Sequence, residues 1–169
     1  MAGDSGDAAL VEADRRWAAD LVARYFGSTA VVSRGVSHDT CSLPGLIARA
    51  NGRRIGLLQY RQAADQLEIV VLIACRPPQG IGRCLLEAAK SVAQSQACWR
   101  LWLITTNDNR PALAFCRAVG WRRCAIHRGA VAAARRLKPQ IPRIGHAGIP
   151  IEDEIEFEFL IGQRPHVRD

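Results

Sequence analysis

Two hydrophobic periodicities run through the chain, one typical of amphipathic helices and one typical of strands. Helical spacing of apolar residues predicts helices over residues 8–26, 81–94, 112–119 and 129–138. Apolar or alternating runs predict strands over residues 29–33, 43–50, 53–61, 69–73, 101–106, 122–127 and 152–161. In the last run, Glu154, Glu156 and Glu158 alternate with apolar residues, which predicts a strand with one face exposed to solvent.

The segments between these elements carry turn and loop signals. Asn51-Gly52 separates two predicted strands and is the strongest short hairpin signal. Arg34 to Ser42 is a polar stretch that we expect to form a loop, and residues 139–150 contain prolines and glycines that predict irregular backbone. The pattern as a whole predicts one domain over residues 1–169, built as a mixed sheet with helices on both faces.

The stretch from Leu67 to Arg83 combines a strand, a loop and the start of a helix. The apolar run Ile69 to Ile73 is long enough for a buried strand, and Pro77-Pro78 ends it because proline cannot donate to a sheet ladder. Gln79-Gly80-Ile81-Gly82 then leads into a helix whose first N–H groups lack internal partners. Glycines let a phosphate approach these groups, so the stretch is a candidate phosphate site; a tight connection is the alternative interpretation.

A second strand and helix follow between Trp99 and Trp121. Residues 101–106 predict a buried strand, and Asn107-Asp108-Asn109 supplies side chains that cap helices. One face of the short helix that follows is apolar, with Ala112, Phe115, Cys116 and Val119.

Together the two stretches resemble motifs of the GNAT acyltransferase superfamily. In that superfamily a Q/R-x-x-G-x-G/A loop holds the pyrophosphate of acetyl-CoA, and an N-x-x-A-x-x-F-Y-x-x-x-G-F segment follows. The second motif here reads N-x-x-A-x-x-F-C-x-x-x-G-W from Asn109 to Trp121. The resemblance implies an α/β fold of the α+β type, with a mostly antiparallel sheet. It also implies a V-shaped splay between the fourth and fifth predicted strands, where pantetheine inserts.

Nearly the whole chain is similar to a bacterial subgroup of this superfamily with a short loop. Five subgroup motifs match here: V-V-S-R-G-x-x-H-D at 31–39, L-P-G at 43–45, T-T-N-D-N at 105–109, G-A-V-x-x-A-R-x-L-K-P-x-I-P at 129–142, and G-I-P-I-x-D-E-I-E-x-E at 148–158. Two features depart from the expected pattern. Pro77 and Pro78 replace the loop's arginine or glutamine and the subgroup's glycine, and Cys116 replaces the tyrosine that usually protonates the departing thiolate.

The resemblance implies acetyl-CoA as co-substrate and direct transfer of its acetyl group to an amine in a ternary complex. A backbone N–H of the central strand is expected to polarise the thioester. The expected cofactor contacts are Leu72, Ile73, Ala74, Gln79, Gly80, Ile81, Gly82, Arg83 and Asn109. The acceptor is a small-molecule or peptide amine that the sequence does not identify.

Three side chains are candidates for the proton transfers of amine acetylation. Glu68 stands at the start of the central strand, where the superfamily often places a base, and alternation predicts it on the same side as Val70 and Leu72. A solvated carboxylate at a strand end is the alternative for Glu68. His38 in the polar loop is the second base candidate because histidine titrates near neutral pH, although a loop His-Asp pair is also a common turn feature. Cys116 is either a proton donor or a small residue that fills space in its helix.

Composition narrows the class of protein. With 49% hydrophobic and 23% charged residues the chain is expected to be soluble and globular, and no run of about 18 apolar residues predicts a membrane span. The first ten residues lack a basic secretory start, so we expect a cytoplasmic protein with six reduced cysteines. Histidine and cysteine spacings match no metal pattern, and no metal is expected.

The formal charge of +7 suits an anionic cofactor. The longest basic cluster, Arg135-Arg136-Leu137-Lys138, ends a predicted helix, where cations stabilise the helix C-terminus. The other arginines are dispersed, so nucleic acid is not an expected partner. Two hypotheses remain: an acetyl-CoA-dependent N-acetyltransferase, or a GNAT-like CoA-binding protein with weak or no activity. Either one leaves a homodimer open.

Overall fold

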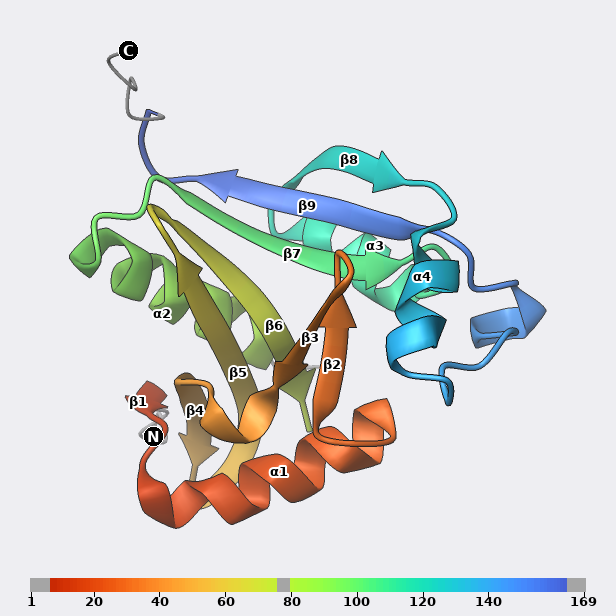
Figure 1. Cartoon of the computed structure of the whole chain (residues 1–169). Coiled ribbons are helices and arrows are strands. Elements are labelled where there is room, and N and C mark those ends of the chain that lie inside the picture. The colour runs from red at the N-terminus through yellow and green to blue at the C-terminus, as the bar shows by residue number, and fades with distance from the viewer. Residues whose placement is uncertain (1–6, 76–79, 164–169) are drawn as a thin grey trace.

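The computed structural model describes residues 7–75 and 80–163 (Figure 1). Its helices are α1 (Glu12–Phe26), α2 (Ile81–Ser95), α3 (Arg110–Ala118) and α4 (Ala130–Leu137), with 3-10 turns at Thr40–Ser42 and His146–Gly148. Its strands are β1 (Asp7–Ala9), β2 (Ala30–Ser33), β3 (Val36–Asp39), β4 (Gly45–Ala50), β5 (Arg53–Ala63), β6 (Gln66–Ala74), β7 (Arg100–Thr106), β8 (Arg122–His127) and β9 (Glu154–Leu160).

Seven of these strands form one sheet in the order β1-β4-β5-β6-β7-β9-β8, and β2-β3 forms a separate hairpin. Neighbours in the sheet are antiparallel except β6 and β7, which run parallel. These two strands pair only from Gln66–Arg100 to Ile69–Leu103, and beyond that point they diverge (Figure 1). The predicted fold is therefore confirmed, including the splay between the fourth and fifth predicted strands, which are β6 and β7.

Helices cover both faces of the sheet. On one face α1 packs Ala18, Leu21 and Val22 against apolar residues of the sheet, and on the other face α2 packs over a larger core together with α3. The β2–β3 hairpin follows α1 and is drawn over the region where β6 and β7 part (Figure 1). Hydrogen bonds of Ser33 and Arg34 join the end of the hairpin to β6 and β9. Within residues 7–75 and 80–163, no helix combines the length and apolarity needed to cross a membrane.

A β-bulge in β6 decides which side of the sheet Glu68 faces. Val70 has no partner in β5 because the register shifts there by one residue. In a regular strand Ile69 and Leu72 would face opposite sides of the sheet, because they are an odd number of residues apart. Both nevertheless pack into the same core beneath α2. The extra residue reverses the side-chain alternation, so Glu68 lies on the α1 face. The predicted placement of Glu68 on the same side as Leu72 is therefore wrong.

Two predicted segments near the N-terminus also differ from the structure. The helix expected from residue 8 begins at Glu12, because Asp7–Ala9 pair with β4 as a strand. The polar loop expected over residues 34–42 contains β3, which pairs with β2 as a short hairpin. A strand with one buried position, His38, carries no apolar alternation, and the sequence therefore gave no strand signal there.

The last strand, β9, is not half-exposed as predicted. Glu154, Glu156 and Glu158 are 2%, 3% and 6% exposed. The strand lies between β7 and β8, and its acidic face is covered by arginines and by the β2–β3 hairpin. Alternation correctly separated the two faces of β9 but could not tell that both are buried.

Candidate active site

The divergence of β6 from β7 leaves backbone groups of β6 without a partner strand. The Cys75 N–H donates to the Ile55 carbonyl of the β5 side at 2.8 Å. Because backbone groups alternate in direction along a strand, the N–H groups of Leu72 and Ala74 point to the opposite, open edge. The side chain of Ile73 is buried against α1, so only its backbone lies near this edge. The open edge presents hydrogen-bond donors and acceptors to any group inserted in the splay.

The N-terminus of α2 follows β6 after a short connection. Gly80 is the N-cap residue with a φ of +70°, a left-handed conformation that favours glycine. A Cβ at Gly82 would lie 2.9 Å from Cζ of Phe115, so glycine allows α2 and α3 to pack closely. The first-turn N–H groups of a helix have no intrahelical acceptor and favour an anion. Gln79, Pro77 and Pro78 lie outside the described residues.

The other expected cofactor contacts have roles within the fold. Asn109 Oδ1 accepts the Ala112 N–H at 3.2 Å, which confirms the predicted cap of α3. The exposed Arg83 donates to the Ala118 carbonyl at 3.2 Å, at the end of α3. Ile81 is buried in the core beneath α2. A cofactor contact by any of these residues stays a prediction.

Glu68 lies against the β2–β3 hairpin and is shielded from solvent. Its carboxylate accepts a hydrogen bond from Ser33 Oγ at 2.7 Å and another from Arg61 Nη2 at 3.3 Å. The residue is 1% exposed, which contradicts the alternative of a solvated carboxylate at a strand end. Arg61 supplies the charge partner that a buried carboxylate needs.

His38, the second base candidate, lies next to Glu68. Its Nε2 is 3.7 Å from Glu68 Oε1 and has no hydrogen-bond partner within residues 7–75 and 80–163, although His38 is only 5% exposed. Burial lowers the pKa of the imidazole, and the charge of Arg61 adds to that effect while Glu68 opposes it. The lowered pKa favours the uncharged form of the His38 ring. His38 itself lies in β3, and its neighbour Asp39 caps the 3-10 turn that follows.

Cys116 lies apart from Glu68 and His38. It is 2% exposed within the core formed by α2 and α3, and burial raises the pKa of its thiol to about 11. Glu68 faces the opposite side of the sheet. The structure thus supports the space-filling interpretation of Cys116.

The hairpin residues Ser33 and Arg34 link the two sides of the splay, and sequence reasoning missed both. Ser33 binds Glu68 of β6, and the Arg34 N–H donates to Glu154 Oε2 of β9 at 3.1 Å. Adjacent residues of one turn therefore hold one carboxyl group from each side. The alternating glutamates of β9 were the available signal, but their burial depends on strand neighbours that are far away in the sequence.

The three glutamates of β9 have different partners. Glu156 binds Arg100 and also His127 Nε2 at 2.7 Å, and Glu158 binds Arg100 Nε at 2.6 Å. Burial acts to raise the pKa of Glu156, but its bonds with Arg100 and His127 outweigh burial and lower the pKa. Glu154 has no side-chain cation within ion-pair distance among the described residues, and burial raises its pKa above the ordinary value.

The basic cluster at the end of α4 is structural, as predicted. Arg135 donates to the carbonyls of Ile141, Pro142 and Ile151 at 3.2, 2.7 and 2.8 Å. Lys138 Nζ donates to the carbonyls of residues 26 and 30 at 2.6 Å each, which fastens α4 to the end of α1 and to β2. These contacts place the segment 129–150 beside the hairpin.

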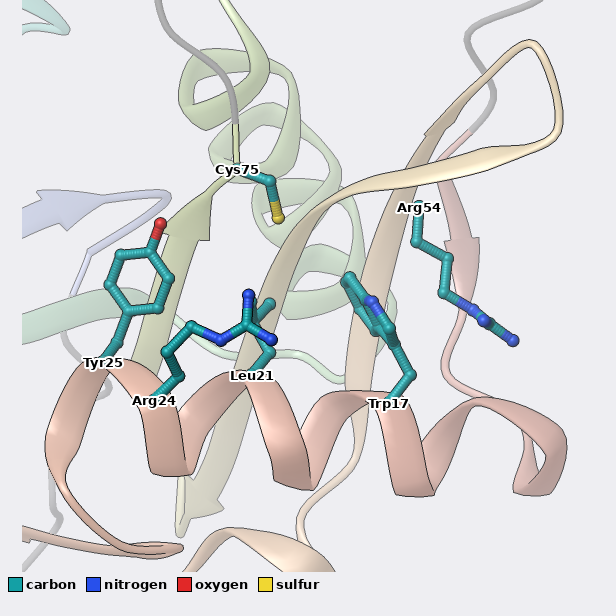
Figure 2. A pocket seen from close by; sticks show the side chains of 6 residues that line it. All are labelled: Trp17, Leu21, Arg24, Tyr25, Arg54 and Cys75. Atoms are coloured by element: carbon teal, nitrogen blue, oxygen red, sulfur yellow. The ribbon is translucent and has the colours of Figure 1, made fainter.

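A cavity of about 440 Å³ adjoins the end of β6 on the α1 face. Figure 2 shows side chains of α1 along one wall, with Cys75 directed into the cavity from the end of β6. The lining residues are Trp17, Leu21, Arg24, Tyr25, Arg54 and Cys75. The guanidinium of Arg54 is held by Asp14 Oδ1 at 2.8 Å and points away from the cavity (Figure 2). The cavity lies on the face that carries Glu68, and its lining comes from α1, from Arg54 of β5 and from Cys75 at the end of β6.

A sheet that parts at its parallel pair, followed by a glycine-capped helix, is the fold of solved N-acetyltransferases. The ribosomal-protein-S18-alanine N-acetyltransferase of Escherichia coli superimposes with a TM-score of 0.64 at 16% identity, covering 95% of this chain and 96% of its own. An acetyltransferase of Bacillus subtilis solved in complex with CoA gives a TM-score of 0.61 at 18% identity, covering 84% and 83%.

Sequence comparison identifies the family. Residues 16–121 match the acetyltransferase (GNAT) family. The uncharacterized protein YdhI of Bacillus subtilis (strain 168) is 37% identical over 145 residues, which cover 84% of this chain and 89% of YdhI. The chain therefore belongs to the GNAT acetyltransferase family.

Proposed function

We propose that this protein transfers the acetyl group of acetyl-CoA to an amine by direct attack in a ternary complex. The single observation that carries the proposal is the parting of β6 from β7 beside a buried Glu68. The family and the similarity to an acetyltransferase solved with CoA support acetyl-CoA as the co-substrate.

This chain offers binding groups for the pantetheine arm and for the pyrophosphate of acetyl-CoA. The pantetheine arm enters the splay, where the N–H groups of Leu72 and Ala74 are available to bind it and to polarise the thioester carbonyl. The pyrophosphate lies at the N-terminus of α2, where Gly80 and Gly82 allow close approach and the helix dipole favours negative charge. Bound in this way, the thioester is held in place for attack, and positioning supplies much of the rate.

The acceptor amine reaches the thioester from the α1 face. The cavity of Figure 2 opens on this face at the end of β6, and its aromatic and apolar walls suit the body of a small molecule or a peptide. Glu68 assists in removing the amine proton, through water, because it is the carboxylate of the central strand on this face. His38 is the second proton acceptor candidate, since its uncharged ring lies beside Glu68.

The buried position of Cys116 favours the second candidate function, a CoA-binding protein with weak or no turnover. A thiol with a pKa of about 11 in an apolar core is a poor proton donor to a departing thiolate. Purified protein is incubated with acetyl-CoA and a panel of primary amines, and free CoA and acetylated products are followed by mass spectrometry. Steady amine-dependent CoA release supports the enzyme, whereas tight acetyl-CoA binding without release supports the binding protein.

A further inference from the structure

We propose that Glu154 gives the departing CoA thiolate its proton, an assignment that rests on the acetyl transfer proposed above. The carboxyl group of Glu154 occupies the side of the splay opposite Glu68. Neither the sequence pattern nor the family motifs point to Glu154 for this role.

The register of the sheet places Glu154 at the open end of the splay. Glu154 is the first residue of β9 and pairs with Thr106, the last residue of β7. β7 pairs with β6 only as far as Leu103, so its end borders the opening. Glu68 lies in the paired part of β6, and Glu154 lies one strand beyond β7 at the open end. Adjacent residues of the hairpin bind both carboxyl groups on the α1 face of the sheet. A thioester that enters where β6 and β7 part therefore meets the sheet face that carries both groups.

The contacts of Glu154 within the described residues include no ion pair. Oε2 accepts the backbone N–H of Arg34, and the charged side chain of Arg34 is directed to Glu156 at 3.7 Å. Glu68, in contrast, is bound by Ser33 and by the guanidinium of Arg61. Two carboxyl groups in such different surroundings are the arrangement that separates a base from an acid.

The groups around Glu154 shift its pKa in opposite directions. Burial raises the pKa of Glu154, and the charge of Glu68 in β6 raises it further, whereas the Arg34 N–H and the charges of Arg34 and of His127 in β8 lower it. Glu156, the neighbour on its own strand, is already neutralised by Arg100. The net pKa lies above the ordinary value of 4.5, so a larger share of Glu154 is protonated near neutral pH than of an exposed glutamate.

The proposed step balances in atoms and charge. The amine nitrogen attacks the thioester carbon, the C–N bond forms, and the C–S bond breaks. The nitrogen loses one proton to Glu68, and the sulfur takes one proton from Glu154. Exchange with water afterwards returns a proton to Glu154 and removes one from Glu68, so acetylated amine and CoA thiol are the only products.

The test compares two acetyl donors with the same amine, one that wild type acetylates. Acetyl-CoA has a leaving thiol that needs a proton, whereas the acetyl thioester of 4-nitrothiophenol leaves without one. We expect Glu154→Gln to lower kcat roughly a hundredfold with acetyl-CoA and to stay within about threefold of wild type with the aryl thioester. Glu68→Gln should lower the rate with both donors, because the amine proton must be removed in either reaction. Glu152→Gln, at an exposed site two residues away, is the matched control and should change neither.

The outcomes separate this assignment from a structural role. An equal loss with both donors, or no loss with acetyl-CoA, overturns it. A melting curve for each variant accompanies the rates; if Glu154→Gln does not fold, Glu154→Asp retains an acid, and its loss should again be confined to acetyl-CoA. If wild type releases no CoA with any amine, the proposed function fails and this assignment fails with it.

Discussion

Replacement of Gly80 tests whether acetyl-CoA binds at the start of α2. Gly80 has a φ of +70°, and a Cβ built on it has no other atom of the described residues within 4 Å, so a Cβ fits there without a clash. The same side chain lies where a pyrophosphate must approach the first-turn N–H groups of α2. Gly80→Val should therefore weaken cofactor binding by steric exclusion.

The structure also gives the cost of Gly80→Val to the free protein. A non-glycine residue in the left-handed region costs about 1–2 kcal/mol, which lowers the melting temperature of a domain of this size by about 2–8 °C. Gly129 is the N-cap of α4 with a φ of +68° and equally open surroundings. Gly129→Val is thus a control with the same backbone strain at a helix N-terminus that we do not assign to acetyl-CoA.

The assay is thermal unfolding with and without acetyl-CoA. At a concentration about a hundred times Kd, binding stabilises wild type by about 2.7 kcal/mol, or about 5–10 °C. Both variants should melt below wild type without ligand, but only Gly129→Val should keep the full shift. Equal acetyl-CoA shifts in the two variants would refute the placement of the cofactor at α2.

Four further predictions follow from the buried polar groups and the cysteine. Glu68→Gln should leave acetyl-CoA binding intact and lower turnover about a hundredfold, with partial recovery at high pH where the amine deprotonates unaided; wild-type turnover and pH profile would leave Glu68 only the role of holding the hairpin. Cys116→Ala should cost about 1 kcal/mol in a urea titration and leave turnover per folded molecule unchanged; a hundredfold drop would contradict the space-filling role. Lys138→Met leaves two carbonyls without their donor and should cost about 2–3 kcal/mol in the same titration, so an unchanged midpoint would count against the contacts described. The raised pKa of Glu154 means that its contribution to stability is present below about pH 4.5 and is lost as pH rises through the folded value. The melting temperature of Glu154→Gln relative to wild type should thus rise between about pH 4 and pH 8; a constant difference would show that Glu154 has the same pKa in both states.

The order of strands and helices could be predicted from the sequence because its signals are local. Asn51-Gly52 requires two successive residues with positive φ, and the structure has them at +49° and +72°. Asn109 caps α3 through an amide only three residues away. Caps, turns and hydrophobic periods act over a few residues, and for this reason α2, α3 and most strands were predicted nearly at their observed bounds.

The candidate site depends on contacts between distant segments, and these were decided only in the folded chain. The bulge at Val70 turns Glu68 to the α1 face, and Ser33 meets Glu68 across 35 positions of sequence. Arg34 reaches Glu154 across 120 positions. Alternation shows that two faces of a strand differ, but it does not show which neighbours cover each face. The sequence therefore determined the fold through local signals, while the packing of a hairpin against the sheet brought Glu68 and Glu154 to adjacent residues of one turn.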